Sequence, residues 1–173
     1  CANPCKTLPL VRSPRYPREM QEKPTTVRSK LFLSKATPGD DAFALWLAPR
    51  LEAEGYEVFA DILSLSPADG WRLKITNTLQ DESIKMLLCC SDETLKREGV
   101  IEEIEIAKDL VRSLGDERFL VPLKMKKFKK IFGIGSLQYI DFERGWVGGL
   151  TQLLKFLDDE GVPKSNTPKI QHA

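Results

Sequence analysis

Histidine is nearly absent from this 173-residue chain, whose single histidine is His172 near the carboxyl end. Acid–base catalysis by imidazole is therefore not expected in the main part of the sequence. The chain also lacks a run of about 20 apolar residues, the length needed to span a bilayer as a helix. It has no excess of one charge, because 26 Lys and Arg stand against 25 Asp and Glu. The overall charge indicates neither a nucleic-acid nor a membrane partner.

The four cysteines do not form a metal-binding pattern. Cys1 and Cys5 lie in the first residues, whereas Cys89 and Cys90 are adjacent, and neither pair has the spacing of a zinc site. Neighbours on a strand point to opposite faces, so a disulfide between Cys89 and Cys90 would be strained. The first residues also lack the apolar core of a secretory signal. We expect reduced thiols, no metal site and a cytoplasmic protein.

Composition divides the chain into three parts. Residues 1–29 contain five of the eleven prolines and no periodic apolar face, which predicts a flexible N-terminal extension. Residues 164–173 are similarly polar and are predicted to be a flexible tail. Residues 30–163 have the alternating apolar pattern of one globular domain.

Strands and helices are predicted to alternate through this domain. The strands are expected at 30–34, 57–61, 83–90, 119–123 and 137–141, and the helices at 41–54, 71–79, 100–114 and 146–159. Asp40 or Asp41 could cap the first helix, and Pro49 predicts a kink or an early break in it. The alternation predicts a parallel α/β sheet with its ligand site beyond the carboxyl ends of the strands, after Ser34, Asp61 and Ser91.

Several short stretches, in this order, resemble a TIR (Toll/interleukin receptor) domain. They are FLSKA at 32–36, LEAEGYEVFAD at 51–61 and KREGVIEEI at 96–104. The resemblance covers about 30–163. With the additional stretches DIL at 61–63, Gly145-Trp146 and GVP at 161–163, the sequence most resembles the TIR proteins that accompany short prokaryotic Argonautes. The resemblance implies a flavodoxin-like fold, with a five-stranded parallel sheet in the order 2-1-3-4-5 and helices on both faces.

The resemblance also implies an activity. Catalytic TIR domains cleave the bond between nicotinamide and ribose in NAD with one glutamate near the start of the third helix, and the matching residue is Glu103. The chain would then be an NAD glycohydrolase, the effector module of a prokaryotic antiviral or anti-plasmid defence system, with NAD as substrate and no cofactor. Such domains usually self-associate, with the loop at 62–70 completing a neighbour's site. A short Argonaute would bind through a segment beyond this sequence.

A single carboxylate is chemically sufficient for this reaction. Ordinary glycosides need two carboxyl groups, one of which protonates the leaving oxygen. Nicotinamide leaves NAD as a neutral molecule without protonation, so the enzyme has to stabilise only the oxocarbenium-like ribose. The residues alone favour Glu103 as a surface carboxylate, because acidic residues are stabilised at helix starts. The resemblance favours catalysis, with the adjacent Glu102 turned about 100° away around the helix.

Four further residues are candidate contacts for the nucleotide: Ser34, Lys35, Asp61 and Trp71. Lys35 could bind a phosphate or be solvated, and it stands where the Argonaute-associated group usually has histidine. Asp61 is equally well explained as a loop cap. Trp71 could be a stacking platform, although a core or loop-anchoring role is favoured. Gly99 stands four positions before Glu103, where many other catalytic TIR domains have an aromatic residue.

Other functions remain open. A non-catalytic TIR scaffold that acts only by assembly is compatible with the same motifs. A phosphoacceptor receiver would need an aspartate at the end of the third strand, where this chain has Cys89, Cys90 and Ser91. The five lysines within 124–130 suit an exposed loop, or a docking patch for nucleic acid or an acidic protein. Direct nucleic-acid binding is not expected of this domain.

Overall fold

The computed structural model describes residues 27–60, 70–128 and 138–165. A five-stranded sheet runs through them in the order β2-β1-β3-β4-β5, and all neighbouring strands are parallel. The strands are β1 (Lys30–Ser34), β2 (Glu57–Ala60), β3 (Ser83–Cys90), β4 (Leu120–Lys124) and β5 (Ile140–Asp141). The predicted flavodoxin-like fold and strand order are confirmed. Most of the predicted N-terminal extension and of the tail lies outside the described residues.

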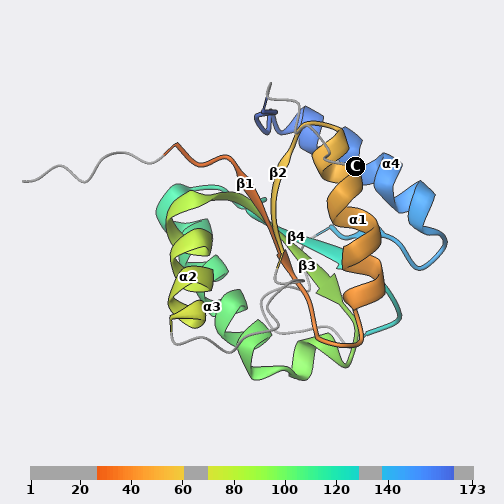
Figure 1. Cartoon of the computed structure of the whole chain (residues 1–173), viewed down its shortest axis with the longest axis horizontal. Helices are drawn as coiled ribbons and strands as arrows, with labels where there is room; N and C mark the ends of the chain where they lie inside the picture. The colour runs from red at the N-terminus through yellow and green to blue at the C-terminus, as the bar shows by residue number, and fades with distance from the viewer. Residues whose placement is uncertain (1–26, 61–69, 129–137, 166–173) are drawn as a thin grey trace, which may run out of the picture.

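Four α-helices cover the two faces of the sheet. They are α1 (Asp41–Ala53), α2 (Trp71–Asn77), α3 (Glu98–Leu114) and α4 (Trp146–Asp159). Helices α1 and α4 lie on one face, and α2 and α3 lie on the other (Figure 1). A π-helical turn, η1 (Thr78–Glu82), continues α2 into β3, and a 3-10 turn, η2 (Thr94–Lys96), precedes α3. None of the described helices has the length and apolar character needed to cross a membrane.

Alternate residues of β1 contribute to two separate cores, because successive side chains of a strand point to opposite faces. Leu31 and Leu33 belong to the core under α1 and α4. Phe32 belongs to the core under α2 and α3. By the same alternation Ser34, the last residue of β1, lies on the α2–α3 side. The strand therefore delivers a polar side chain toward the helix that carries Glu103.

The central strand β3 is buried along almost its whole length, as its apolar sequence predicts. Cys89 and Cys90 are free thiols that point into different cores. Burial raises the pKa of the Cys90 thiol to about 12 and that of Cys89 well above its usual range. Both thiols therefore remain protonated at neutral pH.

The early break predicted at Pro49 is wrong, since α1 continues through it to Ala53. Proline removes one helical hydrogen bond, whose acceptor would be the carbonyl of Leu45. Both Pro49 and Leu45 are exposed, so water can reach that side of the helix. The opposite side is held by the buried Leu47 and Leu51. The packing of this buried side stabilises the helix across the proline.

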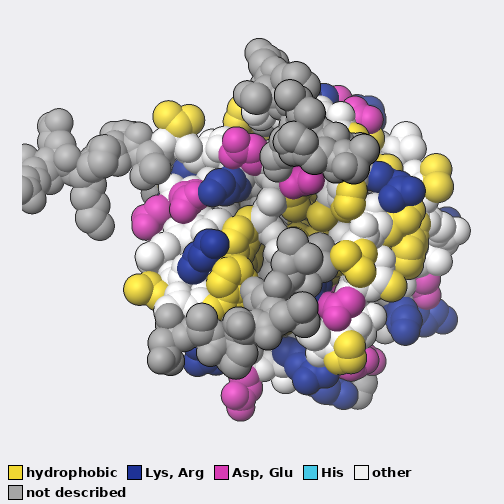
Figure 2. All heavy atoms as spheres, in the orientation of Figure 1, with side chains coloured by type: hydrophobic (Ala, Val, Ile, Leu, Met, Phe, Trp, Pro, Cys, Tyr) yellow, Lys and Arg dark blue, Asp and Glu magenta, His cyan; other side chains and the backbone are white. Residues whose placement is uncertain are grey.

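The outer surface of α1 and α4 carries exposed apolar side chains. Leu45 and Val147 are exposed there, and beside them the Trp46 and Trp146 rings lie 5.3 Å apart between centroids. We call these four residues the α1–α4 apolar face. Apolar side chains gather over this side of the molecule in the space-filling view (Figure 2). When exposed apolar side chains are contiguous over a large area, they commonly mark a surface that contacts another molecule.

Candidate functional site

The carboxyl ends of β1 and β3 meet at the point where the strand order reverses. Strand β2, which follows β1 in the chain, pairs with one edge of β1, and β3 pairs with the other edge. From β3 the order continues outward to β4. Ser34 is paired with Leu88 in the register of the two strands. The segments that follow β1 and β3 therefore lie at the same edge. Ligands of open parallel sheets bind at such reversal points.

Ser34 and Glu103 are in direct contact at this edge. The Ser34 hydroxyl donates a hydrogen bond to Glu103 Oε2 at 2.5 Å. Ser34 is only 2% exposed, and Glu103 is half-buried on α3. The contact joins the end of β1 to the second turn of α3. It places a carboxylate at the expected ligand edge of the sheet.

The neighbouring glutamate has a different environment. The side chain of Glu102 is 61% exposed, and its Oε2 lies 3.7 Å from Arg72 Nη2 of α2. Consecutive helical residues are separated by about 100°, so Glu102 points outward where Glu103 points to the sheet. Only Glu103 of this pair has contact with the end of β1 among the described interactions.

Lys35 forms an ion pair beside the Ser34–Glu103 contact. Its side chain is 3% exposed, and its ammonium lies 2.5 Å from Asp41 Oδ1 and 2.7 Å from Thr37 Oγ1. Lys35 is therefore not the solvated lysine that the sequence left open. A phosphate would have to share this ammonium with Asp41. The hypothesis that Lys35 binds a phosphate stays a prediction.

A buried polar network links the loops after β1 and β3. Asp40 Oδ2 accepts hydrogen bonds from the Ala36 backbone N–H at 2.9 Å and from Thr94 Oγ1 at 2.6 Å. Ser91 Oγ lies 2.7 Å from the same Thr94 hydroxyl. The Asp40 side chain makes no capping bond to α1, contrary to the expectation from its position. Sequence reasoning missed this network, because the partners are far apart in the chain.

Trp71 anchors the start of α2 to the sheet. Its ring stacks on Phe59 of β2 with 6.0 Å between centroids, and Phe59 stacks on Phe32 of β1 at 5.5 Å. Trp71 Nε1 is buried with no hydrogen-bond partner in the part of the chain that the structure describes. The anchoring role favoured by the sequence agrees with these contacts. Asp61 and the loop at 62–69 lie outside the described residues.

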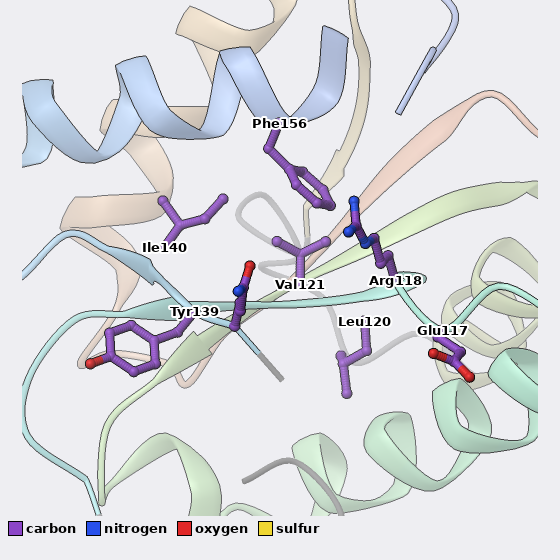
Figure 3. A pocket seen from close by; sticks show the side chains of 8 residues that line it. Glu117, Arg118, Leu120, Val121, Tyr139, Ile140 and Phe156 are labelled. Atoms are coloured by element: carbon purple, nitrogen blue, oxygen red, sulfur yellow. The ribbon is translucent and has the colours of Figure 1, made fainter. Parts of the chain in front are cut away.

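Two cavities occur elsewhere in the described structure. The first, of about 340 Å³, lies beside Leu120 and Val121 of β4, two residues that β5 does not pair with. Figure 3 shows Phe156 of α4 above it, Arg118 and Glu117 toward one end and Tyr139 toward the other. The second, of about 440 Å³, lies against Phe59 and α2. Neither is lined by any of the predicted site residues that the structure describes.

The chemistry available at the reversal point is that of one oriented carboxylate. Glu103 can stabilise a positive charge that develops in a ligand beside it. Additional carboxylates, Glu93 and Glu98, lie on the segment that leads into α3 and at its first residue. No group of three or more His, Cys, Asp or Glu suited to a metal occurs within residues 27–60, 70–128 and 138–165.

The fold and this edge define a doubly wound parallel α/β domain with a single glutamate from α3 at its reversal point. The sequence model of the TIR domain family matches residues 31–154, so the chain belongs to the TIR domain family. An uncharacterized protein of Sinorhizobium fredii, y4cD, is 45% identical over 138 residues, which cover 80% of this chain and 22% of that protein. The chain thus spans about a fifth of that relative's length.

A solved structure has the same architecture. The TIR domains of the activated Roq1 resistosome, which directly recognises the pathogen effector XopQ, align with a TM-score of 0.57. The alignment covers 75% of this chain and 99% of that one at 16% sequence identity. At this identity the likeness shows a shared fold.

Proposed function

We propose that this TIR domain is an NAD glycohydrolase that uses Glu103 as its catalytic carboxylate. The main support is the position of Glu103, which is half-buried on α3 and bonded to Ser34 where the strand order reverses. Family membership adds support, because the resemblance that led to Glu103 is to TIR domains that cleave NAD. The adjacent Glu102 is turned toward solvent and Arg72.

The proposed reaction converts NAD and water to nicotinamide, ADP-ribose and a proton. The glycosidic bond breaks with its electron pair on the nicotinamide nitrogen, so the cationic ring leaves as a neutral molecule. The ribose becomes an oxocarbenium-like cation. The Glu103 carboxylate stabilises this cation by its charge and can accept hydrogen bonds from the ribose hydroxyls. Water then adds to the ribose carbon and loses a proton.

The biological setting is a further part of the proposal. The stretches DIL at 61–63 and KREGVIEEI at 96–104, together with Gly145-Trp146 and GVP at 161–163, are similar to those of TIR proteins that accompany short prokaryotic Argonautes. We therefore place the domain in the cytoplasm, as the effector of an antiviral or anti-plasmid system that depletes NAD when triggered. Self-association would assemble the active form, and the predicted contact loop at 62–70 has only Gly70 among the described residues.

The decisive experiment measures nicotinamide released from NAD at increasing protein concentration, by chromatography. Wild-type protein should release nicotinamide at a rate that rises faster than linearly with its concentration. Glu103→Gln should abolish release while the protein stays folded by circular dichroism, whereas the matched variant Glu102→Gln should retain release. If only Glu102→Gln stops releasing nicotinamide, the catalytic residue is Glu102 and not Glu103. Full activity in both variants would refute the proposal.

The second candidate function is a non-catalytic scaffold, and the α1–α4 apolar face favours it. Val147 is 73% exposed on this face, which suits contact with another protein. A scaffold would self-associate yet release no nicotinamide at any concentration. The same concentration series therefore separates the two functions.

A further inference from the structure

Ser34 was expected among the residues that contact NAD, but its hydroxyl is directed elsewhere. Ser34 Oγ donates to Glu103 Oε2, and the serine is almost completely buried at the end of β1. A hydroxyl has one proton and therefore donates one hydrogen bond at a time. While this bond is made, Ser34 cannot donate to a nucleotide.

We propose that Ser34 is a positioning residue that fixes the direction of the Glu103 carboxylate at the carboxyl edge of the sheet. The inference rests on the proposed function of Glu103 and adds a role for a second residue. Ser34 would act through Glu103, by holding Oε2, and would contribute little to the binding of NAD itself.

The donor is held on a rigid part of the fold. Strand β1 is paired on both sides, with β2 and with β3. Just beyond it, the Ala36 N–H bonds the buried Asp40 carboxylate, which is itself bonded to Thr94. The backbone on both sides of Ser34 is therefore fixed. A donor on such a frame places its acceptor more accurately than one on an exposed loop.

The acceptor needs this constraint. A glutamate side chain has three rotatable bonds, and the half-buried Glu103 is reached by a bond from a different element of the fold. A hydrogen bond to an ionised carboxylate is also stronger than one between neutral groups. A misplacement of about 1 Å of a catalytic group can slow a reaction by about a hundredfold. Loss of the Ser34 hydroxyl should therefore affect turnover.

The next residue does not share this role. The Lys35 ammonium lies against Asp41 and Thr37, on α1 and the loop before it. Ser34 and Lys35 thus hold carboxylates of two different helices, α3 and α1. Of these two neighbours, Ser34 is the one that bonds Glu103.

The test uses the full 173-residue chain and measures kcat and KM for nicotinamide release. Ser34→Ala should lower kcat by about 10- to 100-fold and change KM by less than about twofold. Ser34→Thr keeps the hydroxyl and should restore most of kcat. If the added methyl group unfolds that variant, Ser34→Cys is used instead, because it keeps the side-chain volume with a weaker hydrogen-bond donor. Its kcat should lie between those of wild type and Ser34→Ala.

A matched control is Ser83→Ala at the opposite end of the sheet. Ser83 is also a buried strand serine, but its hydroxyl bonds the Thr78 carbonyl. Its loss should lower the melting temperature and leave kcat unchanged. If Ser83→Ala loses kcat as strongly as Ser34→Ala, the effect is general destabilisation and the inference is overturned. A raised KM with unchanged kcat in Ser34→Ala would return Ser34 to the nucleotide contacts and also overturn it.

A second measurement needs no activity. Melting temperatures of Ser34→Ala, Glu103→Gln and the double variant should show coupling, with the double variant shifted by less than the sum of the single shifts. Additive shifts would overturn the Ser34–Glu103 contact while leaving the proposed function intact. A wild-type chain that releases no nicotinamide at any concentration would overturn the proposed function, and with it the role of Ser34 in turnover.

Discussion

Asp40 Oδ2 accepts a hydrogen bond from Thr94 Oγ1 at 2.6 Å, and this contact joins the loop after β1 to the turn after β3. Both residues are buried, and Thr94 also contacts the hydroxyl of Ser91. Asp40 lies in the segment that follows Ser34, and Thr94 lies in the segment that leads into α3, the helix of Glu103. The bond therefore links the stability of the domain to the geometry of the candidate site.

Thr94→Val should destabilise the domain, because it keeps the side-chain volume and removes the hydroxyl that bonds the buried Asp40 carboxylate. We expect the free energy of unfolding to fall by about 1.5–3 kcal/mol, the range for hydrogen bonds to charged groups. Urea denaturation followed by circular dichroism measures it. The control is Thr151→Val on the exposed side of α4, which should stay within about 0.5 kcal/mol of wild type. Equal stability of Thr94→Val and wild type would contradict the assigned contact.

Two adjacent glycines of α4 should respond in opposite directions to alanine. A Cβ at Gly149 would lie 2.5 Å from the Phe142 ring, whereas a Cβ at Gly148 meets nothing within 4 Å. In Gly149→Ala the free energy of unfolding should therefore fall by about 1–3 kcal/mol, because the added methyl group overpacks the core. In Gly148→Ala the free energy of unfolding should rise by about 0.5–1 kcal/mol, because alanine has a higher helix propensity than glycine. Thermal melting of both variants tests the packing of α4 on Phe142, and a stabilised Gly149→Ala would disprove it.

The sequence predicted the regular elements well where their periodicity is strong. The bounds of β3 and α4 were predicted correctly, because the first is a long apolar run and the second a strongly amphipathic helix. The short edge strand β5 was predicted too long, since two paired residues give little pattern. The strand order itself came from the family resemblance, because alternation of strands and helices fits several orders.

The candidate site was only partly predictable. Motif and strand ends correctly suggested that Ser34 and Glu103 lie at the same edge, and the structure adds that they touch. The sequence does not distinguish the contacts of Ser34 from those of Lys35, but in the structure these neighbours at a strand end reach different helices. The Asp40–Thr94 bond joins residues far apart in the sequence, and no local pattern indicates such a contact.

Acid should weaken the domain through an ion cluster at the amino ends of the strands. Hydrogen bonds from Lys85, and then from Arg118, lower the pKa of Glu160 below its usual value. A carboxylate with a depressed folded-state pKa adds stability above its unfolded pKa of about 4.3, and this stability is lost as the pH falls through the folded value. The free energy of unfolding should therefore decrease as the pH is lowered below about 5.

Lys85→Met should reduce this dependence, because it removes the main cause of the shift while filling the buried space. The matched variant Lys155→Met, whose ion pair with Asp159 is exposed, should leave the acid dependence as in wild type. Urea midpoints measured from pH 3 to 7 provide the comparison. An unchanged slope in Lys85→Met would show that Glu160 does not contribute to acid stability.

The α1–α4 apolar face should mediate contact between copies of this domain. Val147 and Leu45 are exposed beside the paired rings of Trp46 and Trp146, and burial of such a face against a second copy would remove apolar surface from water. Val147→Asp should therefore lower the average mass at high protein concentration, measured by light scattering, without changing the circular dichroism spectrum. Leu73→Asp on α2 is the matched control, because Leu73 is similarly exposed on the other side of the sheet. If the average mass falls in Leu73→Asp and not in Val147→Asp, the contact between copies lies on the side of α2. Monomeric wild-type protein at every concentration would refute self-association through either surface.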